Sequence, residues 1–170
     1  MNPMNTVLFL CSGNYYRSRF AEHLFNAIAE RDRLPWRADS RGLIVEVAGN
    51  IGPISRHVVR GLEQRGICLH DRTRFPLQVR EQELVQADLI IALKEAEHRP
   101  ILAEQLPDWV HRVEYWHVHD LDCAGPEDGL AHLEVEVVAL ASRLASASPG
   151  RPCPRPTVGR MRIEKAKEDL

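Results

Sequence analysis

The segment that most constrains this chain is residues 7–18, which reads Val-Leu-Phe-Leu-Cys-Ser-Gly-Asn-Tyr-Tyr-Arg-Ser. Its apolar first part is short enough to be a buried β-strand, and Phe20, Leu24 and Ile28 then follow at helical spacing. The Ser-Gly-Asn between these two parts predicts a tight loop. A strand, a loop and a helix N-terminus in this order aim backbone N–H groups and the helix dipole at one point. The segment therefore predicts an anion-binding pocket.

A cysteine opens this loop and an arginine closes it, at Cys11 and Arg17. The planar guanidinium of Arg17 offers paired donors that match phosphate oxygens. The positive field of the pocket favours the thiolate form of Cys11, which is the nucleophilic form. Cys68 and Arg74 have the same spacing without a preceding strand or an intervening glycine, so spacing alone is weak evidence. We expect Cys11 to be a nucleophile rather than a buried apolar residue, and Ser18 to be the helix N-cap.

The rest of the chain alternates predicted strands and helices. With 170 residues and 44% hydrophobic content it can form one domain with a substantial core. Strands are predicted at residues 6–10, 37–40, 88–93 and 113–118, and helices at residues 18–31, 81–86 and 130–144, with two more that begin at Pro53 and after Pro100. This alternation predicts an α/β fold of three layers (αβα), with a four-stranded parallel sheet and the phosphate loop after strand one.

Composition also bounds the partners and the compartment. The net charge of −2 gives no support for nucleic-acid binding or for an anionic membrane surface. No apolar run approaches transmembrane length and the first residues lack a signal-peptide layout, so we expect a cytoplasmic protein. Residues 1–146 are predicted to form the domain. Residues 147–170 are rich in proline and arginine and are predicted to form an extension. This extension is either a passive tail or a segment that docks on the body or on a second subunit. The second alternative leaves a homodimer open.

The loop at residues 11–18 resembles the signature loop of the low-molecular-weight protein tyrosine phosphatases, a family that also includes thioredoxin-coupled arsenate reductases. Further similarity lies at residues 39–42, 66–67, 87–92 and 116–120, and the resemblance spans roughly residues 6–145. It implies a phosphomonoester hydrolase that forms a phosphocysteine on Cys11 and needs no cofactor. Its substrate would be a phosphorylated protein or a small phosphomonoester.

The resemblance also assigns roles to individual residues. Cys11, Arg17 and Asp120 would be catalytic, with Asp120 as the general acid after strand four. The family usually has Asp-Pro there, whereas leucine follows Asp120, so Asp122 remains a second candidate. The phosphate would be bound by the loop residues Ser12, Gly13, Asn14, Tyr15, Tyr16, Arg17 and Ser18. Within that loop, Ser18 would hydrogen-bond the sulfur and Asn14 would hold the strained backbone.

Several residues depart from the family pattern. Tyr16 stands where the family usually has a second cysteine that protects the nucleophile from overoxidation. Tyr15 occupies a variable position, where its phenol could stack on a substrate ring or narrow the entrance. The tyrosines that usually follow the Asp-Pro are absent after Asp120, so these residues do not indicate phosphotyrosine specificity.

Three alternatives were weighed against the phosphatase. His117 and His119 share a strand face, but no third ligand is evident, so we expect no metal site. An arsenate reductase needs relay cysteines after the third strand, and residues 93–100 contain none. A non-catalytic phosphate-binding module stays open because of the altered loop neighbours and the missing Asp-Pro.

Overall fold

The computed structural model describes residues 4–70, 73–118 and 125–147. Both candidate acids, Asp120 and Asp122, lie outside these residues, as do His119 and residues 148–170 of the predicted extension. The helices of the described part of the chain are all too short or too polar to cross a membrane.

The sheet has four parallel strands in the order β2-β1-β3-β4. The strands are β1 (Asn5–Cys11), β2 (Trp36–Gly42), β3 (Leu89–Ala92) and β4 (Glu114–Tyr115). The predicted α/β fold with a four-stranded parallel sheet is confirmed. β1 lies inside the sheet, and its residues 7–10 are almost entirely buried because both faces are covered.

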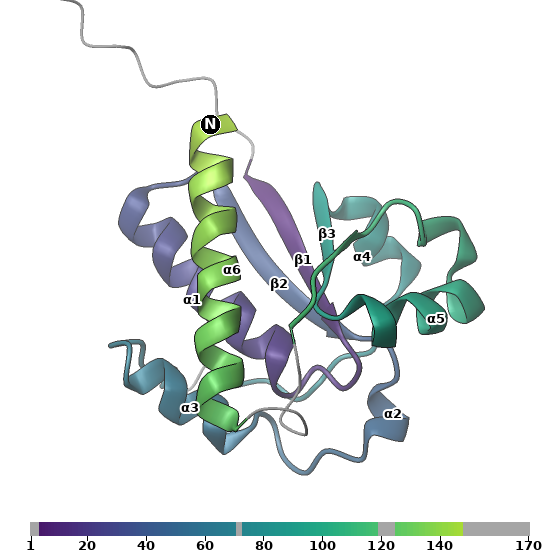
Figure 1. The fold of residues 1–170 in the computed structure, drawn as a ribbon, viewed down its shortest axis with the longest axis horizontal. Helices are drawn as coiled ribbons and strands as arrows, with labels where there is room; N and C mark the ends of the chain where they lie inside the picture. Colours follow the sequence, from purple (N-terminus) through teal and green to yellow (C-terminus); the bar gives the residue numbers. More distant parts are fainter. Residues whose placement is uncertain (1–3, 71–72, 119–124, 148–170) are drawn as a thin grey trace, which may run out of the picture.

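Helices cover the two faces of this sheet (Figure 1). One face carries α1 (Arg17–Asp32), α3 (Arg56–Glu63) and α6 (Pro126–Ala147), and the other carries α4 (Glu81–Gln86) and α5 (Glu95–Gln105). Successive side chains of β1 alternate between two cores: Val7 and Phe9 pack with α1 and α6, whereas Leu8 and Leu10 pack with α4 and α5. The short α2 (Val45–Ala48) and the 3-10 helix η1 (Pro107–Trp109) complete the described elements.

Helix starts differ from the predicted ones at three positions. Ser18 is not the N-cap of α1, because Tyr16 occupies that position and the Ser18 hydroxyl bonds within the loop instead. Pro53 precedes α3, whose N-cap is Ser55, with its hydroxyl accepting from the backbone N–H of His57 at 3.2 Å. Pro100 lies inside α5, because the helix begins earlier, where the backbone N–H of residue 95 bonds the carbonyl of residue 116 at 2.9 Å. The fourth strand is also shorter than predicted, at two residues.

Candidate active site

The loop between β1 and α1 lies at the carboxyl end of the sheet, where ligands bind in folds of this kind. Its first residues are fixed to the segment after β2: the N–H of Leu43 donates to the carbonyl of Cys11, and that of Ile44 to the carbonyl of Ser12, both at 2.9 Å. A pocket of about 250 Å³ opens over the loop. It is lined by Cys11, Ser12, Gly13, Tyr15, Tyr16, Arg17, Ala48, Asn50 and Ser55.

Cys11 is buried and its sulfur has a polar partner. The Ser18 Oγ lies 2.9 Å from the Cys11 Sγ and accepts a hydrogen bond from Asn14 Nδ2 at 3.0 Å. With its lone pair occupied by Asn14, the Ser18 hydroxyl can direct its proton at the sulfur. A thiolate at Cys11 is therefore stabilised by a charge-assisted hydrogen bond.

Asn14 lies behind the loop rather than in the pocket. Its φ of 50° is in the left-handed region, which asparagine tolerates better than most residues. The fully buried side chain donates to Ser18 and Ser40 and accepts from Arg74 at 2.8 Å and from the backbone N–H of Leu77 at 3.0 Å. These four hydrogen bonds hold a strained conformation that the loop requires.

Arg74 supports the loop through contacts that sequence reasoning missed. Its guanidinium contacts Asn14, the backbone carbonyl of Ser40 at 2.8 Å, and the carboxylates of Glu22 at 3.2 Å and Asp39 at 3.4 Å. The pKa of Glu22 is raised, chiefly by burial and against the opposing effects of Ser40 and Arg74. No local pattern marks Arg74, because apart from the carbonyl of Phe75 the hydrogen-bond and ion-pair partners of its guanidinium are more than 30 positions away in the sequence.

Arg19 is the second arginine behind the loop, and its side chain is fully buried. It donates to the carbonyl of Pro53 at 3.1 Å and to that of Arg74 at 2.8 Å. Burial and the charge of Arg74 lower the pKa of Arg19 to about 10. Arg19 thus links the segments that precede α3 and α4.

Arg17 lines the pocket and is paired with a carboxylate from the far side of the sheet. Its two terminal nitrogens donate to Glu97 of α5, Nη1 to Oε2 at 3.1 Å and Nη2 to Oε1 at 2.9 Å. The hydroxyl of Ser12 also donates to Glu97. Glu97 was not singled out from the sequence, because the predicted helix begins only after Pro100 and no local pattern indicates a contact 80 positions away.

The rim of the pocket comes from the segment between α2 and α3. The hydroxyl of Tyr15 donates to the carbonyl of Ile51 at 2.9 Å, and the N–H of Ser55 donates to the carbonyl of Tyr15 at 3.1 Å. The phenol is therefore part of the wall and ties this segment to the loop. Gly13 fits beneath it, since a Cβ there would lie 2.3 Å from Asn50 Nδ2.

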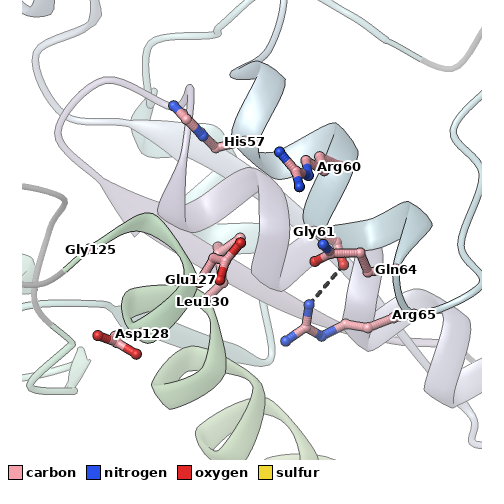
Figure 2. Close-up of a pocket in the computed structure, with 9 residues that line it drawn as sticks. All are labelled: His57, Arg60, Gly61, Gln64, Arg65, Gly125, Glu127, Asp128 and Leu130. Atoms are coloured by element: carbon pink, nitrogen blue, oxygen red, sulfur yellow. Dashed lines mark hydrogen bonds between the residues drawn. The ribbon is translucent and has the colours of Figure 1, made fainter.

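A second cavity, of about 490 Å³, lies between α3 and the start of α6 (Figure 2). His57 and Arg60 of α3 line it together with Glu127 and Asp128 of α6. Its other arginine, Arg65, is occupied by the carbonyl of Gly61, the carboxylate of Glu134 and the ring of Phe20. The cavity has no nucleophile among its lining residues, and within the described ranges no three metal-ligating side chains cluster. Of these two cavities, only the smaller is lined by a cysteine.

Comparison with known proteins agrees with this geometry. The family model described as low molecular weight phosphotyrosine protein phosphatase matches residues 6–147. A protein-arginine-phosphatase of Bacillus subtilis (strain 168) is 35% identical over 99 residues, which cover 58% of this chain and 61% of that protein. The match therefore spans less than two thirds of the length of this curated relative.

Solved structures share the fold over most of the chain. The arginine phosphatase YwlE, as a mutant with a phosphorylated active-site serine, has a TM-score of 0.70 and 25% identity, with 84% of this chain and 97% of that one covered. A low molecular weight protein tyrosine phosphatase from T. tengcongensis has a TM-score of 0.67 and 27% identity, with 84% and 98% covered. The chain belongs to the low-molecular-weight protein tyrosine phosphatase family, and the place of Cys11 after β1 is consistent with a cysteine-based phosphatase.

Proposed function

We propose that this protein removes phosphoryl groups from phosphorylated proteins through a phosphocysteine intermediate on Cys11. The observation that carries the proposal is the shared pocket of Cys11 and Arg17, with the Ser18 hydroxyl 2.9 Å from the sulfur. A nucleophile and a bidentate phosphate ligand are thereby combined at a helix N-terminus. Support also comes from a YwlE mutant in which a serine that replaces a cysteine in the active site is phosphorylated.

In the first step the Cys11 thiolate attacks phosphorus, the bond to the leaving group breaks and an S–P bond forms. Arg17 and the N–H groups of the loop stabilise the charge on the three equatorial oxygens. Asp120 gives a proton to the leaving group, with Asp122 as the second candidate for this role. The residue so deprotonated becomes the base of the next step.

In the second step that carboxylate takes a proton from water as the oxygen attacks phosphorus. The S–P bond breaks, inorganic phosphate forms and the sulfur leaves as a thiolate. Ser18 would stabilise the departing thiolate through its hydroxyl proton. The enzyme returns to its initial charge and protonation state.

The phosphorylated residue could be tyrosine or arginine. The family to which the chain belongs favours phosphotyrosine, and the arginine-phosphatase activity of the Bacillus subtilis relative favours phosphoarginine. Tyr15 forms a wall of the pocket, held through Ile51, so the substrate side chain would pass alongside its ring. A cytoplasmic location and a homodimer also remain proposals.

The test is turnover of p-nitrophenyl phosphate by the wild type and by Cys11→Ser, followed by two peptides of one sequence that carry phosphotyrosine or phosphoarginine. Cys11→Ser should lose turnover and still bind phosphate. Activity retained in Cys11→Ser would refute the mechanism. A wild type that binds phosphate without hydrolysing any of the three substrates would instead be a phosphate-binding module.

A further inference from the structure

Glu97 reaches the phosphate loop from α5, an element on the opposite face of the sheet from α1. Its carboxylate accepts from both terminal nitrogens of Arg17 and from Ser12. Each terminal nitrogen of an arginine carries two protons, so this pairing uses two of the five guanidinium donors. Glu97 thus contacts Ser12, which follows Cys11, and Arg17, which lies near the end of the loop.

His98 stands behind Glu97 and is fully buried. Its Nδ1 accepts a hydrogen bond from the backbone N–H of Lys94 at 3.1 Å, so in the neutral ring the proton is on Nε2. The Nε2 lies 3.5 Å from Glu97 Oε1. The ring orientation set by Lys94 therefore places Nε2 close to the carboxylate.

The contacts keep Glu97 charged. The pKa of Glu97 is held far below its usual range by His98 first, then by Arg17 and Ser12, against the opposing effect of burial. The side chain is 31% exposed, so it retains some contact with solvent. Glu97 is thus an anion at every pH at which a thiolate nucleophile would operate.

We propose that Glu97 is a positioning residue, oriented by His98, that fixes Arg17 and Ser12 at the phosphate loop. A free arginine side chain carries about 2 kcal/mol of rotamer entropy, which must be lost when it binds a phosphoryl group in one geometry. Glu97 removes that freedom before the substrate arrives, which is a form of preorganisation. The turnover tests of this inference rest on the proposed function, whereas its binding test does not.

The first experiment compares Glu97→Gln with wild type. The amide keeps the shape of the side chain but places an NH₂ group against the Arg17 donors, so kcat/KM should fall about 10-fold to 100-fold, mostly in kcat. Glu95→Gln is the matched control: it lies on the same helix, pairs with Arg99 at 2.7 Å, and should stay within about twofold of wild type. Equal losses in both variants, or none in Glu97→Gln, would overturn the proposal.

The second experiment asks whether Glu97 acts through Arg17. In a double-mutant cycle, Glu97→Gln should add less than about threefold to the loss already caused by Arg17→Lys, because the contact it supports is then gone. Losses that multiply would show that Glu97 acts elsewhere and would overturn the inference. The thermal unfolding midpoints of the single variants are measured as well, so that a loss of activity caused by a folding defect can be recognised.

The third experiment does not depend on catalysis. Inorganic phosphate is titrated calorimetrically into Cys11→Ser and into Cys11→Ser combined with Glu97→Gln. Positioning predicts binding about 3-fold to 10-fold weaker in the double variant, since the net contribution of one ordinary hydrogen bond is of this order. Tighter binding would mean that Glu97 competes with phosphate for Arg17, and equal binding would mean that Glu97 does not position it. Either result would overturn the proposal. Weaker binding together with an inactive wild type would remove only the proposed function.

Discussion

Arg17 and Arg19 are two residues apart on α1, and both guanidinium groups are almost completely buried. Residues at this separation do not face each other on a helix, so the two side chains have different surroundings. Arg17 lines the phosphate pocket and meets the carboxylate of Glu97 in a bidentate pair. Arg19 points behind the loop and bonds mainly to backbone carbonyls. A buried arginine is thus a ligand-binding group or a structural link according to its partners.

The two environments have different energetic consequences. Arg17 has a charged partner in direct contact, whereas the nearest carboxylate to Arg19, that of Glu22, is 3.7 Å away. Within the described structure the Nε and Nη2 atoms of Arg19 have no hydrogen-bond partner. An incompletely paired buried cation is costly, and the lowered pKa of Arg19 reflects that cost. The link that Arg19 makes between two loops offsets it.

The strongest way to break this comparison is Arg17→Lys. Lysine keeps the charge but loses the planar fork, so kcat/KM should fall about 100-fold to 1000-fold, as when a main transition-state donor is removed. Arg31→Lys is the control, because Arg31 is on the same helix, 72% exposed and paired only with its neighbour Asp32 among the described contacts. Steady-state kinetics of both variants measure the effect. An Arg17→Lys enzyme within a few-fold of wild type would remove Arg17 from phosphate binding.

Arg19→Met should affect folding more than catalysis. The substitution leaves the partly buried carbonyls of Pro53 and Arg74 without their donor, which costs about 2 kcal/mol in the free energy of unfolding. Urea unfolding measures this loss, and kcat/KM at low temperature should remain within about fivefold of wild type. A variant with normal stability and a large catalytic defect would place Arg19 with Arg17 as a group of the active site.

Arg74→Lys is expected to have an intermediate effect on both properties. A lysine cannot contact Asn14, Ser40 and Glu22 together, so the left-handed conformation of Asn14 loses part of its support. We expect a loss of about 1 kcal/mol in stability, and a decrease of about fivefold in kcat/KM, since the loop then spends part of its time in other conformations. Arg80→Lys is the control, because Arg80 is close to Arg74 in the sequence and is exposed. Indistinguishable kinetics in the two variants would contradict the role of Arg74.

The smallest effect concerns pH. The pKa of Glu97 is lowered on folding, so its contribution to stability is present above the unfolded value of about 4.3 and is lost as the pH falls through the folded value. The pKa of Glu22 is raised, so its contribution runs the other way: stability decreases as the pH rises from about 4.3 through the folded value. Relative to wild type, Glu97→Gln should therefore lose less stability on acidification from pH 6 to pH 3, and Glu22→Gln should lose more. Urea unfolding midpoints, measured across this pH range, give the difference in stability between each variant and wild type. If the two differences changed with pH in the same direction, the assignment would be contradicted.

Much of the fold could be predicted because its signals are local. The buried strand, the Ser-Gly-Asn loop and the apolar helix stripe lie within 25 residues of each other, and the phosphate loop follows from them. The failures arise where a tertiary contact decides the outcome. Ser18 has the right chemistry for an N-cap, but its hydroxyl is taken by Cys11 and Asn14. Pro100 does not precede the helix start as predicted, because the contact between residues 95 and 116 starts α5 ahead of it.

The site shows the same limit. Cys11 and Arg17 could be identified from their local context, which requires no knowledge of distant residues. Arg74 and Glu97 could not, because they meet the loop from 60 and 80 positions away in the sequence. Arg80 is near Arg74 in the sequence and Glu95 is near Glu97, yet the structure gives neither Arg80 nor Glu95 a side-chain contact with the phosphate loop among the described residues. Only the packing of the sheet distinguishes these pairs.

Residues 74–79 support Asn14 and form a coil without a helix. This coil is fixed to the end of β2 by hydrogen bonds of Gly42 with Leu77 and Val79, each of 2.8 Å. Local opening of this coil would release two of the four bonds that hold Asn14. The equilibrium between open and closed coil therefore limits the fraction of molecules in which the pocket is formed. Any ligand that favours the formed pocket also favours the closed coil. We therefore expect bound phosphate to protect backbone amides of this coil from hydrogen exchange, although they do not line the pocket.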